Sequence, residues 1–227
     1  IDGLYERCPK GLDGIVCNAG VSGSCGNYEL VISLNYFGTV KLARGVYELL
    51  KKKHGSVVVT VSNTISQGTG RMDIVDLLNN VGDEQRIRSI VSTLDTANQT
   101  VGQSMYMATK YALARWVRRI SASWAANGVR VNAVAPGNVR TAMTDSLSDA
   151  AKYAVSALPI PVRYGSDALM DPSEIAESMK FLLSNSARGV NGVILFTDGG
   201  DRESVVKGKS VGLGGRRIIK KLNNVGD

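Results

Sequence analysis

The chain has 227 residues and a formal net charge of +7; 44% of its residues are hydrophobic and 21% are charged. This composition is ordinary for a soluble globular protein and excludes the collagen-like, intrinsically disordered and coiled-coil classes. No apolar run reaches the length of a membrane-spanning helix and the N-terminus shows no signal-peptide pattern, so we expect no membrane contact and no secretion.

The first half of the chain predicts a strand, a helix and a second strand. A short apolar run over residues 14–17 ends at Asn18-Ala19-Gly20, and a helical pattern follows over about residues 28–50. Three lysines, a histidine and a glycine close that helix, because cations and glycine suit a helix C-terminus. Residues 56–61 are rich in β-branched side chains and are bounded by polar ones, which predicts a strand buried on both faces.

The second half repeats this alternation. A long helix is predicted to begin near Tyr106 and to end at Asn127-Gly128, and residues 129–134 follow as a strand. Ser173 is expected to cap a further helix, and residues 193–196 form a last strand. Strands that alternate with helices predict an α/β fold with a doubly wound parallel sheet and helices on both faces.

The segment from Gln67 to Gln103 does not follow this alternation. Its apolar residues predict two short amphipathic helices inserted between a strand and the long helix. Insertions of this length in a compact domain usually act as lids or as interface elements. We therefore expect residues 67–103 to serve one of these purposes.

Tyr106 and Lys110 carry the first chemical signal. Four residues apart on a helix, the two side chains lie on one face. A phenol ordinarily has a pKa near 10, and a neighbouring cation lowers that pKa toward the range useful for acid–base catalysis. Taken alone the pair is a weak signal, because eight tyrosines and many lysines make a chance match common.

Other polar residues lie where an open α/β sheet places its ligand crevice, at the carboxyl ends of strands. Asn18-Ala19-Gly20 follows the first strand, Ser62 the second, and Pro136-Gly137 the third, while Asn35 lies on the intervening helix. With Tyr106 and Lys110, this combination resembles the short-chain dehydrogenase/reductase family over about residues 11–200. The long insertion before the tyrosine is most similar to the bacterial hydroxysteroid dehydrogenase/carbonyl reductase branch.

The resemblance implies a Rossmann-like fold and an oxidoreductase that transfers a hydride between a nicotinamide cofactor and a carbonyl or secondary alcohol. Tyr106 would be the acid–base group, Lys110 would lower its pKa and hold the nicotinamide ribose, Ser62 would bind the substrate oxygen, and Asn35 would hold a water. Asn63 and Ser66 remain alternatives to Ser62. The implied cofactor-binding residues are Asn18, Ala19, Gly20, Tyr106, Lys110, Pro136, Gly137, Val139 and Thr141.

The family's glycine-rich phosphate turn is expected near the C-terminus instead of the front of the chain. Strands 1 to 3 of the family are not recognisable before residue 11, whereas Gly208, Gly212 and Gly214 reproduce the glycine spacing of that turn. One interpretation is a permuted strand–turn–helix unit within a single dinucleotide-binding domain over residues 1–227. The other is a basic tail, since residues 201–227 contain seven basic and three acidic side chains.

Two functions from different classes remain open. The first is the oxidoreductase, with a small-molecule carbonyl or alcohol substrate that could be steroid-like. The second is a dinucleotide-binding protein or fragment that keeps the site residues without turnover. Nucleic-acid binding is disfavoured, because the basic residues of the tail have no interleaved aromatic residues.

The sequence gives less detailed expectations for the cofactor type, the oligomeric state and the cellular location. We expect NAD, with NADP open, because the residue that distinguishes them follows a strand that is not recognisable here. We expect a homodimer formed around residues 175–196 or through the insertion, which should obstruct the tyrosine helix. Three cysteines are too few, and odd in number, for a disulfide framework, so we expect a cytoplasmic protein without a metal site.

Overall fold

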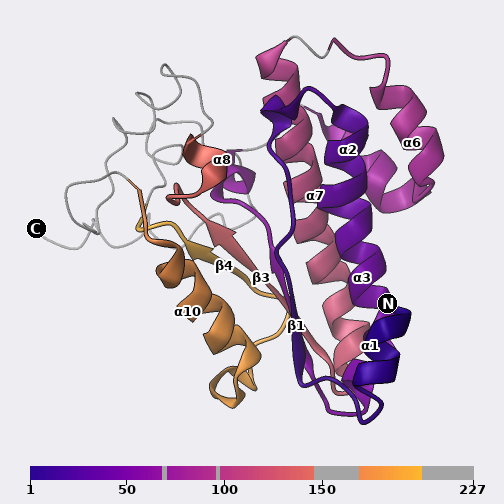
Figure 1. The fold of residues 1–227 in the computed structure, drawn as a ribbon, viewed down its shortest axis with the longest axis vertical. Coiled ribbons are helices and arrows are strands. Elements are labelled where there is room, and N and C mark those ends of the chain that lie inside the picture. Colours follow the sequence, from indigo (N-terminus) through magenta and orange to yellow (C-terminus); the bar gives the residue numbers. More distant parts are fainter. Residues whose placement is uncertain (68–70, 96–97, 146–168, 201–227) are drawn as a thin grey trace, which may run out of the picture.

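The computed structural model describes residues 1–67, 71–95, 98–145 and 169–200, which form one layer of parallel strands between helices (Figure 1). The sheet has the order β1-β2-β3-β4, and each neighbouring pair is parallel. Its strands are β1 (Gly14–Cys17), β2 (Ser56–Thr60), β3 (Arg130–Pro136) and β4 (Ile194–Thr197). The four strands predicted over residues 14–196 are therefore present, and the predicted parallel sheet is confirmed.

The strands form where β-branched residues are buried on both faces. Val57, Val58 and Val59 of β2 are fully buried, because β2 lies between β1 and β3 and its alternating side chains enter buried clusters on both faces of the sheet. Among the described residues β1 pairs only with β2 and β4 only with β3. Residues 201–227, including the glycines of the predicted phosphate turn, lie outside the described residues.

Helices cover both faces of the sheet (Figure 1). One face carries α2 (Tyr28–Ile32), α3 (Thr39–Gly45) and α7 (Gln99–Ala125), and the other carries α10 (Pro172–Leu183). Two buried clusters result, a large one that includes Ile32, Leu113 and Trp116 and a smaller one that includes Ile175 and Leu182. None of the described helices is both long and apolar enough to cross a membrane.

The remaining short elements connect these layers. They are α1 (Asp2–Arg7), η1 (Gly23–Cys25), η2 (Ser33–Gly38), α4 (Tyr47–Lys51), η3 (Asn63–Gln67), α5 (Met72–Asp76), η4 (Leu77–Val81), α6 (Glu84–Val91), α8 (Ala142–Asp145) and η5 (Asn185–Ala187). Two of them, η2 and η4, are π-helical segments. Such segments interrupt an α-helix locally and are frequent at functional sites.

One predicted helix has the expected ends but contains breaks, and another begins earlier than predicted. The helix expected over residues 28–50 is divided into α2, η2, α3 and α4, with the last break at Val46, whose φ of −100° and ψ of 5° are not helical. The long helix begins at Gln99 instead of near Tyr106, because Asn98 caps it: Asn98 Oδ1 accepts hydrogen bonds from the backbone of Thr100 and Val101.

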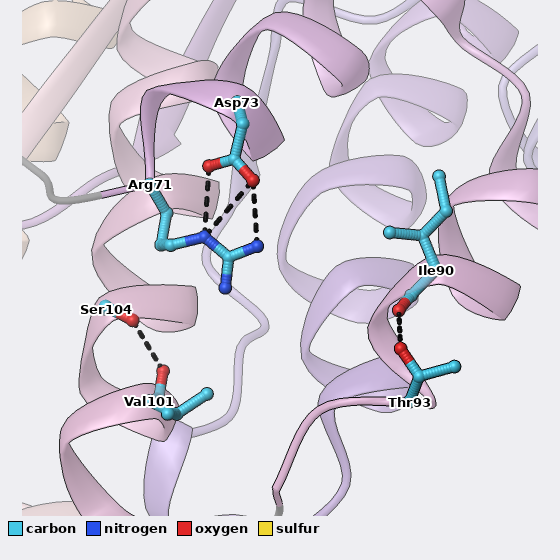
Figure 2. Close-up of polar contacts among 6 residues, drawn as sticks. All are labelled: Arg71, Asp73, Ile90, Thr93, Val101 and Ser104. Atoms are coloured by element: carbon cyan, nitrogen blue, oxygen red, sulfur yellow. Dashed lines mark hydrogen bonds and ion pairs between the residues drawn. The ribbon is translucent and has the colours of Figure 1, made fainter.

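The insertion contains the two predicted amphipathic segments, α5 with η4 and then α6. Their buried apolar residues, Ile74, Leu78 and Ile87 among them, belong to the large cluster. Hydrogen bonds lie at both ends of this region (Figure 2). At the start of α5, the Arg71 guanidinium donates to the Asp73 carboxylate, and after α6 the Thr93 hydroxyl donates to the Ile90 carbonyl oxygen. The segments pack on α7 and α2, so the insertion covers the outer side of the tyrosine helix, as expected.

Candidate active site

A cavity of about 470 Å³ opens at the carboxyl ends of the strands. This is the edge where an open parallel sheet binds ligands, because its loops diverge there and helix N-termini point toward it. The lining residues come from every strand end except that of β4, and from α7, α8 and α10. They are Asn18, Gly20, Thr60, Val61, Ser62, Tyr106, Lys110, Pro136, Gly137, Val139, Thr141, Ala142, Met143, Thr144, Pro172, Ile175, Ala176 and Met179.

Tyr106 and Lys110 both face this cavity from α7. Lys110 Nζ lies 5.7 Å from the centre of the Tyr106 ring, as the four-residue spacing predicts. Lys110 is 4% exposed, and burial lowers the pKa of its ammonium from 10.5 to about 8. The ammonium donates a hydrogen bond to the Thr60 carbonyl oxygen at 3.0 Å, which fixes it at the end of β2.

Tyr106 is partly buried, and burial raises the pKa of its phenol. A hydrogen bond with the Ser62 side chain opposes that rise. The net direction of the Tyr106 pKa is therefore upward, because desolvation of the phenolate dominates. The ammonium of Lys110 is directed at the Thr60 carbonyl. Its predicted lowering of the Tyr106 pKa stays a prediction.

Ser62 is the serine that reaches the cavity. It directly follows Val61 at the end of β2, contacts Tyr106, and its Oγ accepts a hydrogen bond from the Thr64 backbone at 3.3 Å. The alternatives Asn63 and Ser66 do not line the cavity. Ser66 Oγ donates a hydrogen bond to the Asn63 carbonyl oxygen at 2.8 Å.

Asn35 lies behind the cavity wall, fully buried in η2. Its carboxamide holds Val21 at both backbone groups: Oδ1 accepts from the Val21 N–H at 2.8 Å and Nδ2 donates to the Val21 carbonyl at 2.9 Å. The structure thus shows Asn35 fixing the loop after β1. The role as a water holder stays a prediction.

Gly20 lies between Asn35 and Lys110. A Cβ at this position would be 3.1 Å from Asn35 Oδ1 and 3.4 Å from Lys110 Nζ, so a side chain would crowd both functional groups. Glycine therefore keeps the ammonium accessible from the cavity. Ala19 is exposed and is not among the lining residues.

The loop after β3 and the helices α8 and α10 form the apolar wall. Val139 pairs with Met170 in an isolated parallel bridge, and Thr144 Oγ1 donates to the Val139 carbonyl at 2.9 Å. These contacts hold the loop that contains Pro136, Gly137 and Thr141 against the cavity. The lining residues that were not predicted are Thr60, Val61, Ala142, Met143, Thr144, Pro172, Ile175, Ala176 and Met179.

Of the predicted cofactor-binding residues, Asn18, Gly20, Tyr106, Lys110, Pro136, Gly137, Val139 and Thr141 line one cavity. Gly208, Gly212 and Gly214 lie outside the described residues, so their role stays a prediction. The missed residues of α8 and α10 are, apart from Thr144, apolar and look like ordinary core positions. Nothing in the sequence alone distinguishes them from the core.

The chain is similar to known proteins over most of its length. The family model described as enoyl-(acyl carrier protein) reductase matches residues 84–201. A 3-alpha-hydroxysteroid dehydrogenase/carbonyl reductase of Comamonas testosteroni is 32% identical over 198 residues, which cover 87% of this chain and 75% of that protein. A galactitol 2-dehydrogenase of Cereibacter sphaeroides is 43% identical over 99 residues, which cover 43% of this chain and 37% of the other.

Among solved structures, the 3-alpha-hydroxysteroid dehydrogenase from Pseudomonas sp. B-0831, complexed with NADH, matches with a TM-score of 0.77 and 31% identity. The match covers 92% of this chain and 80% of that one. A hydroxysteroid dehydrogenase from Escherichia coli shares the fold, with a TM-score of 0.60 and 22% identity over 88% of this chain and 67% of the other.

Proposed function

We infer that this chain, which belongs to the short-chain dehydrogenase/reductase family, transfers a hydride between a nicotinamide cofactor and a carbonyl or secondary alcohol. The observation that carries the inference is that Ser62, Tyr106 and Lys110, contributed by a strand end and one helix, converge on one cavity. Its location at the carboxyl ends of parallel strands suits a dinucleotide.

Two features of the cavity support the binding of a nicotinamide riboside, the Lys110 ammonium and the missing side chain of Gly20. Lys110 presents a buried ammonium beside Gly20, whose missing side chain leaves the space in front of Nζ open. An ammonium is a donor that suits the two hydroxyl groups of a ribose. When bound, the cofactor supplies or accepts the hydride, and the residues of this chain handle the proton and the substrate oxygen.

Tyr106 exchanges the proton in this scheme. Because burial raises the pKa of its phenol, Tyr106 holds its proton at neutral pH and can donate it to the oxygen of a carbonyl as that oxygen gains charge. Ser62 is hydrogen-bonded to Tyr106 and can donate to the same oxygen, which stabilises the developing charge. In the direction of alcohol oxidation, the phenol must first release its proton to solvent, and the resulting phenolate then accepts the proton of the alcohol.

The substrate that suits the cavity is a ring-bearing, largely apolar ketone or secondary alcohol, such as a steroid. Support comes from the apolar side chains of Val61, Val139, Met143, Ile175 and Met179, which line the same cavity as the reacting groups. The relatives from Comamonas testosteroni and Pseudomonas are named for steroid substrates. NAD is the proposed cofactor because the Pseudomonas structure contains NADH, and NADP stays the alternative.

Turnover separates this function from that of a dinucleotide-binding protein without activity. The full chain is incubated with NADH or NADPH and a series of ketones that includes a steroid 3-ketone, a decalone and acetone. We expect cofactor consumption that is fastest for the fused-ring ketones. The alternative would be favoured if the cofactor binds tightly but is not consumed with any ketone. The reverse direction, with oxidised cofactor and a series of alcohols, should then also show no turnover.

The proposed assembly is a dimer through α10 and β4. Support comes from the insertion, which covers the outer side of α7, and from Phe181 of α10, which is 44% exposed. Phe181→Glu should convert a dimer to a monomer in size-exclusion chromatography with light scattering, and a dimer that persists would contradict this interface. A cytoplasmic location is proposed because Cys8, Cys17 and Cys25 are all free thiols.

A further inference from the structure

The loop between β1 and α2, residues 18–27, contacts the insertion at a point where two backbones meet. Gly23 of this loop and Gly102 of α7 are both buried, and each is the other's near neighbour. Gly102 belongs to the insertion, because the inserted segment ends within the first turns of α7. The insertion therefore reaches the loop that contributes Asn18 and Gly20 to the cavity.

The contact requires both glycines. A Cβ at Gly23 would collide with the carbonyl oxygen of Gly102, and a Cβ at Gly102 would collide with the carbonyl oxygen of Gly23 and lie 3.4 Å from a ring carbon of Tyr28. Both obstacles are backbone atoms, which cannot rotate away as a side chain can. Glycine is a poor helix former, so its presence in the second turn of α7 is explained by this close approach.

Tyr28 provides a second attachment of the loop to the insertion. Its side chain is 2% exposed, and its hydroxyl donates to the carbonyl oxygens of Asp95 at 3.0 Å and Asn98 at 3.2 Å. Asn98 in turn caps the N-terminus of α7 through its Oδ1. The start of α2 and the start of α7 are thus tied together.

Asn35 provides the third attachment, through its two hydrogen bonds to the backbone of Val21. The loop is consequently held at Val21, Gly23 and Tyr28. Gly20, next to Val21, lines the cavity beside Lys110 Nζ. Only Val21 and Ser22 separate Gly23 from Gly20, so a displacement of Gly23 reaches Gly20 through a short segment of chain.

We propose that Gly23, Gly102 and Tyr28 are positioning residues for the cofactor, and that the insertion acts as a brace for loop 18–27. The proposal rests on the proposed function, since it takes the cavity at Gly20 as the cofactor site. Breaking the brace shifts the loop and weakens cofactor binding. The acid–base groups stay in place, because Tyr106 and Lys110 lie one to two turns further along α7 and Ser62 follows the end of β2.

The main test is Gly102→Ala in the full chain, with NADH affinity measured by calorimetry and kcat measured at saturating cofactor. In an ordinary helix this change favours the folded state, so Gly3→Ala, with nothing within 4 Å of the added Cβ, is the matched control. We expect the Kd for NADH to rise about tenfold with Gly102→Ala, kcat to stay within about twofold, and Gly3→Ala to match the unchanged chain.

Tyr28→Phe is the second variant, because it keeps the ring and removes only the donor to Asp95 and Asn98. It should raise the Kd for NADH about threefold and leave kcat unchanged, whether or not Gly102→Ala folds. An unchanged Kd in Tyr28→Phe and in a folded Gly102→Ala overturns the brace while the proposed function stands. A fall in kcat with unchanged Kd also overturns it. If the unchanged chain itself fails to bind NADH, the proposed function fails first.

Discussion

The hydroxyl of Thr60 donates a hydrogen bond to Asn18 Oδ1 at 2.7 Å, and this bond joins the ends of β1 and β2 at the floor of the cavity. It follows from the register of the sheet, in which Cys17 pairs with Val59, so the next residues of both strands lie side by side. The carbonyl of the same Thr60 accepts the hydrogen bond of Lys110 Nζ. One threonine therefore orients two cavity residues.

Thr60→Val removes the hydroxyl and keeps the shape of the side chain. Asn18 then loses its partner, and we expect the Kd for NADH to rise about threefold to tenfold, with a loss of about 1 kcal/mol in the free energy of unfolding. Thr60→Ser, which keeps the hydroxyl, is the control and should retain most of the affinity. Equal affinities for the two variants would show that the Asn18 contact does not matter for binding.

Tyr106→Phe tests the acid–base group. The ring remains while the proton donor is lost, so turnover should fall by a factor of about 10² or more with little change in cofactor affinity. Tyr111→Phe, on the same helix and outside the cavity lining, is the matched control and should keep its activity. A Tyr106→Phe enzyme with half of the original turnover would contradict the assignment.

Much of this site could be predicted because its chemistry depends on local spacing. The i and i+4 positions of Tyr106 and Lys110 place both on one face of a helix, and the turn residues after the strands place Asn18, Ser62 and Gly137 at one edge of the sheet. These consequences follow from helix and sheet geometry. The strands were found for the same reason, since runs such as residues 56–60 are too β-branched and too short for a helix.

The features that could not be predicted depend on tertiary packing. Met143 and Met179 face the cavity only because α8 and α10 lie across the strand ends, which no local pattern shows. The direction of the Tyr106 pKa depends on how deeply its side chain is buried in the fold, which the spacing of Tyr106 and Lys110 does not reveal. The start of α7 was misplaced because Asn98 was not recognised as its cap.

The glycine spacing near the C-terminus leads to a binding prediction that the described residues do not test. If Gly208, Gly212 and Gly214 contact the pyrophosphate, a chain shortened after Gly200 and the variant Gly212→Val should both lose NADH binding in calorimetry, since only a residue without a Cβ permits close approach of backbone to phosphate. Gly189→Ala, which adds a Cβ in open space, is the control. Unchanged affinity in the shortened chain would make the segment a basic extension.

Lys110 also predicts how the stability of the fold varies with pH. Burial lowers the pKa of its ammonium from 10.5 in the unfolded chain to about 8 in the folded one. Between these values the unfolded chain binds more protons than the folded chain, so raising the pH through this window favours folding. At pH 7 the folded chain holds a buried charge, and the associated cost diminishes as the ammonium loses its proton.

Lys110→Met removes this titration and keeps an unbranched side chain of similar length. We expect the free energy of unfolding of the unchanged chain to rise by about 2 kcal/mol relative to Lys110→Met between pH 7 and pH 10, because one pKa unit corresponds to about 1.4 kcal/mol. Urea unfolding of both chains across this range measures the difference, and titrations shared by the two chains cancel. A difference that stays constant, or that moves in favour of Lys110→Met as the pH rises, would show that Lys110 is not a buried ammonium with a lowered pKa.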